Sequence, residues 1–268
     1  MRAGAQSIMV RPPAVAGLFY AQDPDRLRAE VSELIRHAGV SAAGAPRALI
    51  VPHAGYVYSG RVAASGFATL RASAETITRV VVIGPAHYVH VRGIAAPTVD
   101  AFATPLGRIA VDRDVLTALG DLASVVQTDA PHAPEHALEV ELPFLQVLLS
   151  PFTIVPLVVG TAEPKEVAEV LRRLWGASET LIVVSSDLSH FHDYETARRV
   201  DAGTASAIER GDWKNIGPDQ ACGFLPVAGL LIEAERRGLR AQRLSLCNSG
   251  DTAGLRDRVV GYGAWMFA

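Results

Sequence analysis

The chain has 268 residues, of which 49% are hydrophobic and 20% are charged, and its formal net charge is -3. This length and composition predict a sizeable core in one domain over residues 1–268, with residues 1–10 as a flexible N-terminal extension. Because the chain has no long Lys/Arg run, no apolar run long enough to span a bilayer and no signal-peptide core at its start, we expect a cytoplasmic protein that binds neither nucleic acid nor membranes.

Short β-branched runs alternate with segments of helical period along the chain. The predicted strands lie at 48–51, 80–83, 153–159, 181–185 and 259–265. The predicted helices lie at 25–37, 61–70, 113–119, 137–149, 164–175, 194–210 and 226–237. We expect the Ala/Gly-rich stretch 39–46 to be a surface connection. The alternation is typical of a single α/β domain with a parallel or mixed sheet covered by helices.

Three of the eight histidines come at or just after the end of a predicted strand. They are His53 in "LIVPHAGYVYSG", His87 in "VVVIGPAHYVH" and His190 in "VVSSDLSH". Ligands of open α/β sheets collect at the carboxyl ends of the strands, so we expect these side chains to converge. Taken singly, each histidine is better explained as a hydrogen-bonded structural residue. Together, neutral imidazoles beside a carboxylate favour a divalent metal site.

Asp187 supplies a carboxylate between the strand at 181–185 and His190. With histidines from separate loops, it would complete a face of two histidines and one carboxylate that leaves positions open on Fe(II). The alternative is a helix N-cap, because "SSD" ahead of a helix is suited to accept free backbone N–H groups. The residues alone leave both roles open.

A second group of polar residues lies in "HAPEHALEVELPF", where His132, His136 and Glu139 have spacings that share one face of a helix. The segment does not match the HExxH zinc motif. Glu135 or Glu139 is expected to orient His136, as a brace or a proton-transfer pair near the metal. A solvated helix start with favourable acidic residues explains the same pattern equally well.

Other chemistries have little support in the sequence. There is no GxSxG nucleophile elbow, no GxxxxGK[ST] loop and no GxGxxG after a strand, which argues against a serine hydrolase and against nucleotide binding. Cys222 and Cys247 are too few for a disulfide framework, fit a reduced compartment, and are interpreted as small buried thiols.

Seven motifs in order resemble one family. They are "RPPAVAGLFY", "VPHAGYVYSG", "VVIGPAHY", "EHALEVELPFLQ", "VSSDLSHF", "ACGFLPV" and "NSGDTAG…VVGYGAW". In this order they resemble the MEMO family, called AmmeMemoRadiSam system protein B in bacteria and archaea, from about Arg11 to Phe267. The family is similar in fold to class III extradiol dioxygenases of the protocatechuate 4,5-dioxygenase type. The resemblance implies an α/β sandwich with a nonheme iron site at one edge of the sheet.

The resemblance also implies site residues. His53 and His87 match two histidine ligands, and Asp187 and His190 match polar residues of the same pocket. In animal members a cysteine ten residues before the terminal tyrosine completes the site, but the matching position here is Thr252, a much weaker ligand. Cys247 comes five residues too early, so either Asp251, Asp187 or His190 completes the coordination, or metal binding is weaker than in the animal members.

The resulting expectation is a metal-dependent, dioxygenase-like oxidoreductase that holds Fe(II), with Cu and Zn as alternatives. The expected metal ligands are His53, His87, His190 and Asp187. The expected catalytic residues are His190, His136 and Asp187, of which His190 or His136 would move a proton. The expected substrate-pocket residues are Tyr56, Glu139, Asp251 and Thr252, although a buried aromatic with a satisfied hydroxyl explains Tyr56 equally well.

Two alternatives to an enzyme remain open. One is a metal-binding or peptide-binding scaffold, in which the strand-end cleft holds a small molecule or peptide without turnover. The other is a partner of a radical SAM protein and an AMMECR1-like protein, as the bacterial family name implies.

Overall fold

The computed structural model describes residues 8–39 and 44–268. Within these ranges the α helices are α1 (Pro24–His37), α2 (Tyr56–Phe67), α3 (Arg113–Thr117), α4 (Leu142–Leu148), α5 (Pro164–Leu174), α6 (Tyr194–Arg210) and α7 (Phe224–Arg237). The 3-10 helices are η1 (Ala68–Ser73), η2 (Glu139–Glu141), η3 (Trp213–Asn215) and η4 (Ser249–Asp251). No helix in these ranges has the length and apolar composition needed to cross a membrane.

The strands form one mixed sheet. They are β1 (Val10–Arg11), β2 (Ala48–Val51), β3 (Arg79–Pro85), β4 (Ile94–Ala96), β5 (Ala101–Thr104), β6 (Gly107–Val111), β7 (Val125–Gln127), β8 (Thr153–Val159), β9 (Thr180–Ser185), β10 (His190–His192), β11 (Ala241–Asn248) and β12 (Val259–Phe267). The order across the sheet is β1-β5-β6-β8-β3-β9-β2-β12-β10, with β11 against β12 and β4 against β7 and β8. The central strands β8, β3, β9 and β2 are parallel.

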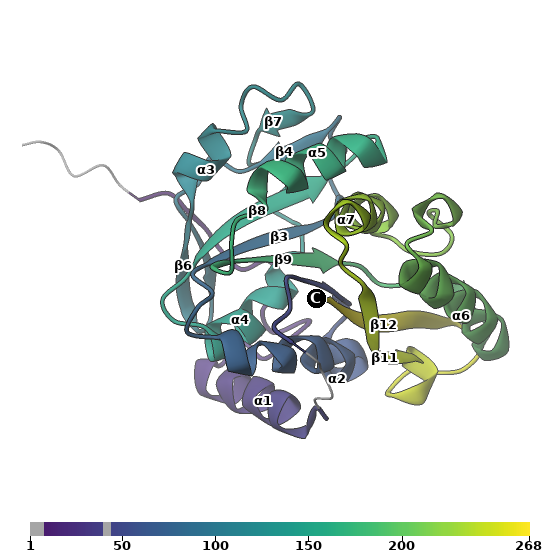
Figure 1. The fold of residues 1–268 in the computed structure, drawn as a ribbon. Coiled ribbons are helices and arrows are strands. Elements are labelled where there is room, and N and C mark those ends of the chain that lie inside the picture. The colour runs from purple at the N-terminus through teal and green to yellow at the C-terminus, as the bar shows by residue number, and fades with distance from the viewer. Residues whose placement is uncertain (1–7, 40–43) are drawn as a thin grey trace, which may run out of the picture.

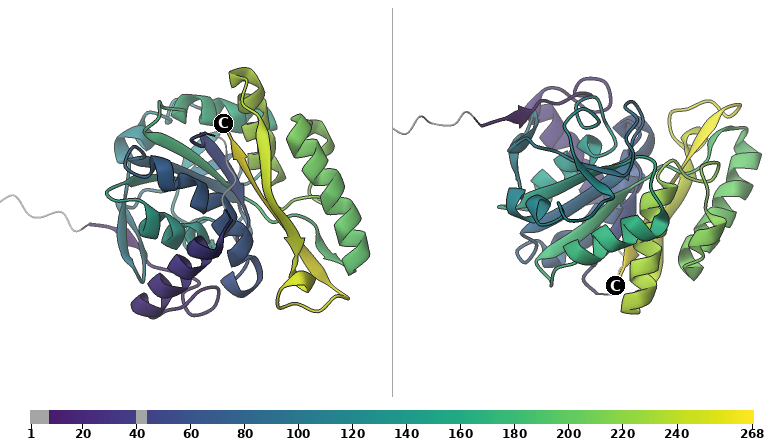
Figure 2. Two further views of the ribbon diagram at one scale, coloured as in Figure 1. Left: turned by 60° about the horizontal axis from the view of Figure 1, so that its bottom comes forward. Right: turned by 90° about the horizontal axis from the view of Figure 1, so that it is seen from above.

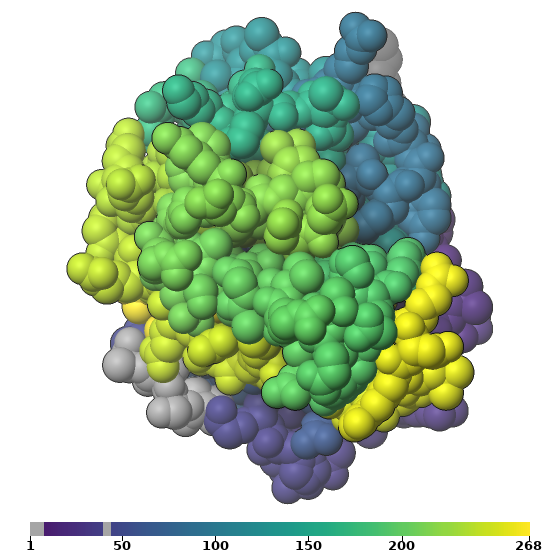
Figure 3. Space-filling model, turned by 90° about the vertical axis from the view of Figure 1, so that its right-hand side faces the viewer, coloured from purple at the N-terminus to yellow at the C-terminus, as the bar shows by residue number. Residues whose placement is uncertain are grey.

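Helices cover both faces of the sheet. Helices α5 and α7 pack together on one face, while α1, α2 and α4 lie on the other (Figures 1 and 2). Helix α6 packs on β11 and β12, and with α7 and the β11–β12 region it forms one side of the molecule (Figure 3). Because both faces are covered, β2 and β9 are buried along their whole length and their sequences are nearly all apolar. The expected α/β sandwich with a central mixed sheet is confirmed.

The strongly apolar strands were predicted well and the short edge strands were not. The strands expected at 48–51 and 153–159 have the predicted bounds, as does the helix expected at 194–210. Strands β1, β4, β5, β6, β7, β10 and β11 were missed, because most are short or carry polar residues. Helix α2 begins at Tyr56, five residues before the expected start at Arg61.

The N-cap interpretation of Asp187 is wrong. Helix α6 begins at Tyr194, and its N-cap is Asp193, whose side chain accepts from the Thr196 N–H. Asp187 instead accepts a hydrogen bond from the backbone N–H of His53 at 2.9 Å.

The start of the described chain is held by a buried ion pair. Residues 1–7 of the expected flexible extension lie outside the described residues, and so do residues 40–43 of the expected surface connection. Val10 belongs to β1, which pairs with β5. The Arg11 guanidinium pairs with Glu139, and both side chains are almost fully buried. Glu139 also accepts hydrogen bonds from Ala14 N–H, Val15 N–H and Tyr20 O–H.

We predict that Glu139→Ala lowers the free energy of unfolding by about 3–5 kcal/mol, because it leaves the buried Arg11 charge without a partner. The matched control is Glu33→Ala, which removes a carboxylate paired with Arg36 at the exposed surface and should cost less than about 1 kcal/mol. Urea unfolding of both variants measures the difference. Equal losses would contradict the structural role of Glu139.

A second buried carboxyl group belongs to helix α6. Asp201 of α6 is 2% exposed, and its Oδ1 accepts from the Ser189 N–H. Burial raises the pKa of Asp201 to about 6. Since this pKa exceeds the unfolded value of about 3.9, the folded state binds the proton more tightly, and stability falls as pH rises from about 4 to about 6.

We predict that Asp201→Asn removes this pH-dependent cost and keeps the acceptor for Ser189. Its free energy of unfolding should exceed that of the wild type by about 2 kcal/mol at about pH 8, and the difference should shrink below about pH 4. Urea unfolding across this range, with exposed Asp257→Asn as the control, provides the measurement. A difference that does not change with pH would contradict the prediction.

Candidate functional site

Three neighbouring parallel strands end at the candidate site. Strands β3, β9 and β2 pair side by side, so that Val51 lies opposite Ser185 and Ile83 opposite Val184. His53 follows β2, His87 follows β3 and Asp187 follows β9. The rings of His53 and His87 lie edge to face with their centroids 5.1 Å apart. The convergence that we expected of the strand-end histidines is therefore present for His53 and His87.

A third histidine joins this pair. His136 lies in the loop between β7 and η2, and its ring centroid is 5.2 Å from that of His53 and 4.7 Å from that of His87. One ligand atom from each of the three histidines lies within 4.8 Å of the others, a grouping that could hold a metal ion. We name His53, His87 and His136 the histidine cluster.

The surroundings of His53 keep it neutral. Its side chain is almost fully buried, and its Nδ1 lies 2.7 Å from Ser185 Oγ. Burial lowers the pKa of His53 well below its ordinary value, and the nearby His87 lowers it further. A neutral imidazole with one nitrogen engaged has the other nitrogen available as a ligand.

Glu135 orients His87. The Nδ1–H of His87 donates to Glu135 Oε1 at 2.8 Å, and its backbone N–H donates to Oε2 at 2.7 Å. Burial alone would raise the pKa of Glu135, but the hydrogen bonds that it accepts from His87 and from the Ala137 N–H outweigh burial and lower that pKa to about 2. Glu135 is thus an ionised carboxylate behind a histidine, the arrangement that fixes the tautomer of a metal ligand.

His136 lies beside Glu135, one of the two carboxylates expected to orient it, but does not hydrogen-bond to it. Its Nδ1 lies 3.3 Å from Glu135 Oε1 but makes no hydrogen bond there, and it has no other hydrogen-bond partner in the described structure. Burial lowers the pKa of His136 to about 4, so the ring is neutral near pH 7. A buried ring nitrogen without a partner fits a ligand position.

The segment around His132 is a series of turns. The expectation that His132, His136 and Glu139 share a helix face is wrong, because the first helical residue after β7 is Glu139. His132 is 1% exposed and its Nε2 contacts the Ala95 carbonyl. Glu139 is fully buried against Arg11, so it does not orient His136.

Asp187 and His190 lie beside the histidine cluster but are not part of it. Asp187 is 5% exposed. Burial raises the pKa of Asp187, and the nearby His190 and the hydrogen bond from the His53 N–H act in the opposite direction. His190 begins β10, where a bulge and a Phe191 φ of 64° interrupt the pairing with β12. Such strain is uncommon for an aromatic residue and marks a position where a strand redirects its side chains.

Cys222 was not singled out as a site residue from the sequence. Its Sγ lies 3.4 Å from His53 Nε2, and burial raises the pKa of the thiol to about 12. Gly223 allows this approach, because a Cβ there would lie 2.7 Å from Ser186 Cβ. Cys222 also lines a cavity of about 210 Å³ together with His90, Phe224 and the ends of β3 and β8. The one sequence feature that could have pointed to Cys222 was the segment "ACGFLP" at the start of a predicted helix.

The other expected pocket residues lie elsewhere. Tyr56 is 4% exposed and its hydroxyl donates to the Val140 carbonyl at 2.8 Å, so it is a buried aromatic with a satisfied hydroxyl. Asp251 and Thr252 line a separate cavity of about 790 Å³ that also contains Cys247 and Arg61. The Asp251 carboxylate accepts from the Tyr194 hydroxyl.

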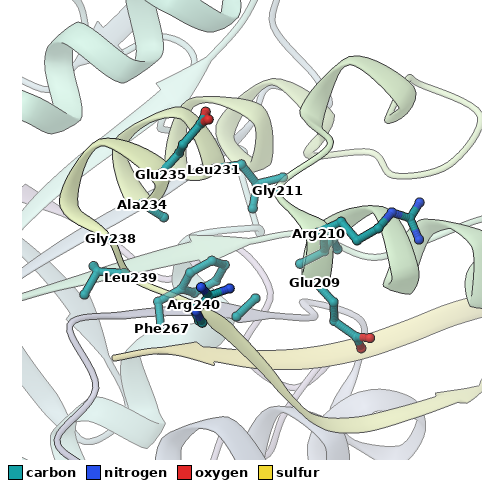
Figure 4. Close-up of a pocket in the computed structure, with 12 residues that line it drawn as sticks. Glu209, Arg210, Gly211, Leu231, Ala234, Glu235, Gly238, Leu239, Arg240 and Phe267 are labelled. Atoms are coloured by element: carbon teal, nitrogen blue, oxygen red, sulfur yellow. The ribbon is translucent and has the colours of Figure 1, made fainter.

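A further cavity of about 240 Å³ lies where α6 and α7 end (Figure 4). Its lining includes Glu209, Leu231, Arg240 and Phe267, and none of the expected site residues. Cys222 precedes the other end of α7, and the 14 residues of that helix span about 21 Å. This cavity is therefore remote from the histidine cluster.

Comparison with solved structures shows the fold. An uncharacterized protein from Escherichia coli K12 aligns with a TM-score of 0.52 and 14% sequence identity, over 81% of this chain and 98% of that chain. At this identity the likeness concerns the architecture alone.

Comparison with known sequences shows the family. A MEMO1 family protein of Saccharolobus solfataricus is 33% identical over 285 residues, covering 97% of this chain and 99% of the relative. A MEMO1 family protein of Sulfolobus acidocaldarius is 33% identical over 278 residues, covering 95% and 98%. The sequence model of the family described as "Memo-like protein" matches residues 11–266. The chain belongs to the Memo-like family.

Proposed function

We propose that the protein binds one divalent metal ion through His53, His87 and His136. The observation that carries this proposal is the convergence of three ligand atoms within 4.8 Å, from two strand ends and a separate loop. Imidazole nitrogen suits Fe, Cu and Zn. The low pKa values of His53 and His136 mean that these ligands need not lose a proton before they bind a cation near pH 7.

His136 would be the third ligand of the metal ion, beside His53 and His87. Thr252 and Asp251 line a different cavity, and Asp187 is engaged by the backbone N–H of His53. We take Fe(II) as the first candidate metal and Cu or Zn as alternatives. When bound, Fe(II) would supply redox chemistry and a Lewis acid for an oxygenated small molecule.

The protein's own residues would hold and protonate that molecule. The cavity lined by Cys222, His90 and Phe224 is linked to His53 through Cys222, and its volume of about 210 Å³ suits a small ligand. His190 is partly exposed beside Asp187, which suits it to exchange a proton with a bound ligand. We therefore propose a dioxygenase-like oxidoreductase, with His190 as the residue that moves a proton.

A second candidate is a metal-containing scaffold that binds a peptide without turnover. Three exposed apolar side chains directly follow or lie close to site residues in the sequence: Val57 is 66% exposed, Tyr88 57% and Phe191 60%. A contiguous exposed apolar patch marks an interaction site, so this candidate requires these side chains to lie on one face. Under this candidate, that face would bind a radical SAM or AMMECR1-like partner. Under either candidate we place the protein in the cytoplasm, where the free thiols of Cys222 and Cys247 would stay reduced.

We predict that His53→Ala, His87→Ala and His136→Ala each lower metal affinity by more than about 100-fold, since loss of a ligand should cost more than loss of a residue behind it. The measurement is the metal content of anaerobically purified protein, followed by titration with Fe(II) and Zn(II). His37→Ala, an exposed histidine in the last turn of α1, is the control. Equal metal content in all four variants would sink the proposed site.

We predict that His190→Ala keeps the metal but lowers oxygen consumption with a panel of catechols by about 10²–10⁴-fold, because a positioned proton donor is lost. Oxygen uptake by the iron-loaded protein measures this. If the wild type consumes no oxygen with any catechol while holding iron, the scaffold is favoured over the dioxygenase-like enzyme.

A further inference from the structure

Glu141 is a buried carboxyl group that the proposed function does not use. It ends η2 and is 0% exposed. Glu139, two residues earlier, is paired with Arg11, but no Lys or Arg of the described chain forms an ion pair with Glu141. Its Oε1 lies 2.8 Å from Ser185 Oγ, and its Oε2 has no hydrogen-bond partner. An ionised carboxylate in this position would be costly, because one contact with a hydroxyl group, without a cationic partner, does not compensate its lost hydration.

Ser185 connects Glu141 to His53. The Ser185 Oγ lies 2.7 Å from the Ala137 carbonyl oxygen, 2.8 Å from Glu141 Oε1 and 2.7 Å from His53 Nδ1. A hydroxyl group has one proton to donate and two lone pairs that accept. Since a carbonyl oxygen only accepts, Ser185 donates its proton to Ala137. The other two neighbours must then donate to Ser185.

Because Ser185 has one proton, the protonation of Glu141 and the tautomer of His53 are both determined. Glu141 donates only as a neutral acid with an O–H group, and His53 donates only if its proton is on Nδ1. An ionised Glu141 can only accept the hydrogen bond from the Ser185 hydroxyl. The Ser185 Oγ and the Ala137 carbonyl oxygen would then lie 2.7 Å apart with no proton between them, which is unfavourable. Independently, burial raises the pKa of Glu141 well above its ordinary value, and the charge of Asp187 raises it further.

The Cys222 thiol agrees with this assignment. Its Sγ lies 3.4 Å from His53 Nε2, and its raised pKa keeps the S–H proton in place. A thiol can donate weakly to Nε2 only if that nitrogen carries a lone pair. The contact therefore fits a His53 ring with the proton on Nδ1.

We propose that Glu141 is a neutral acid which, through Ser185, holds His53 as the Nδ1–H tautomer, so that Nε2 keeps the lone pair with which it binds the metal, in place of the weak contact with the Cys222 thiol. Glu141 is thus a positioning residue, and its effect on metal binding rests on the proposed function. The two strand-end ligands then differ: His87 is backed by the ionised Glu135, whereas His53 is backed by a hydroxyl and a neutral acid. His53 is the less electron-rich of the two ligands.

The first test uses metal-free protein. Infrared difference spectra at about pH 8 between the wild type and Glu141→Gln should contain the C=O band of a protonated carboxyl group, which an ordinary glutamate has lost at that pH. Glu233→Gln, which changes a buried Glu beside Arg236 and Arg237, is the control and should show no such band. Absence of the band in the Glu141→Gln difference spectrum overturns the proposal.

The tautomer is read from the same metal-free wild type. Two-dimensional ¹H–¹⁵N spectra of the histidine rings should show His53 protonated at Nδ1, and Ser185→Ala should lose this preference. Because the wild-type spectrum alone decides the assignment, the test holds even if a variant folds poorly. A wild-type His53 protonated at Nε2 overturns the proposal.

Metal affinity gives the functional readout. Ser185→Ala and Glu141→Leu should each weaken Zn(II) binding by about 10–100-fold, the usual effect of removing a residue behind a ligand. Glu141→Gln should restore most of that loss, because its amide N–H donates to Ser185 as the acid does. If Glu141→Gln loses as much Zn(II) affinity as Glu141→Leu, the positioning role of Glu141 is contradicted. If His53→Ala binds Zn(II) as well as the wild type, the proposed metal site fails, whereas the infrared and ring spectra still decide the protonation of Glu141 and His53.

Discussion

The parallel pairing of β3, β9 and β2 is the constraint on which the site depends. Its register places Ile83 beside Val184 and Val51 beside Ser185, so the three strands end at nearly the same level. Both faces of these strands are buried, so a shift in register would disturb the close packing of their side chains on both faces at once. The loops that carry His53, His87 and Asp187 can therefore meet only at this edge.

Two carboxyl groups lie behind the histidines, and they differ in charge: Glu135 is ionised and Glu141 is neutral. Glu135 receives hydrogen bonds from His87 and Ala137 and stays charged, with a pKa of about 2. Glu141 contacts Ser185 and has no cationic partner among the described residues, and burial keeps its pKa high. A cation in the histidine cluster would thus face one fixed negative charge behind His87, with Asp187 nearby. This arrangement suits a single divalent ion better than an anion.

Much of the fold and part of the site could be predicted from the sequence. The long apolar runs at 48–51 and 153–159 identify central strands because burial on both faces leaves little choice of residue. His53 and His87 were found because each closely follows such a strand. The short edge strands were missed because polar and apolar residues both suit an edge that is partly exposed.

His136 and Cys222 show where prediction from the sequence ends. The spacing of His132, His136 and Glu139 indicated a helix, but turns send His136 toward His53 and Glu139 toward Arg11. Cys222 reaches His53 across 169 positions of the chain, because Gly223 can lie against Ser186. Neither contact has a local sequence signal, since both depend on how loops far apart in the chain pack together.

Anomalous X-ray diffraction from crystals of the metal-loaded protein tests the central claim most directly. Data collected at the absorption edge of Fe or Zn should show one strong peak bonded to ring nitrogens of His53, His87 and His136, with Nε2 as the ligand atom of His53. A metal bound instead beside Cys247 and Asp251, or no ordered metal in protein that contains one equivalent in solution, would contradict the account.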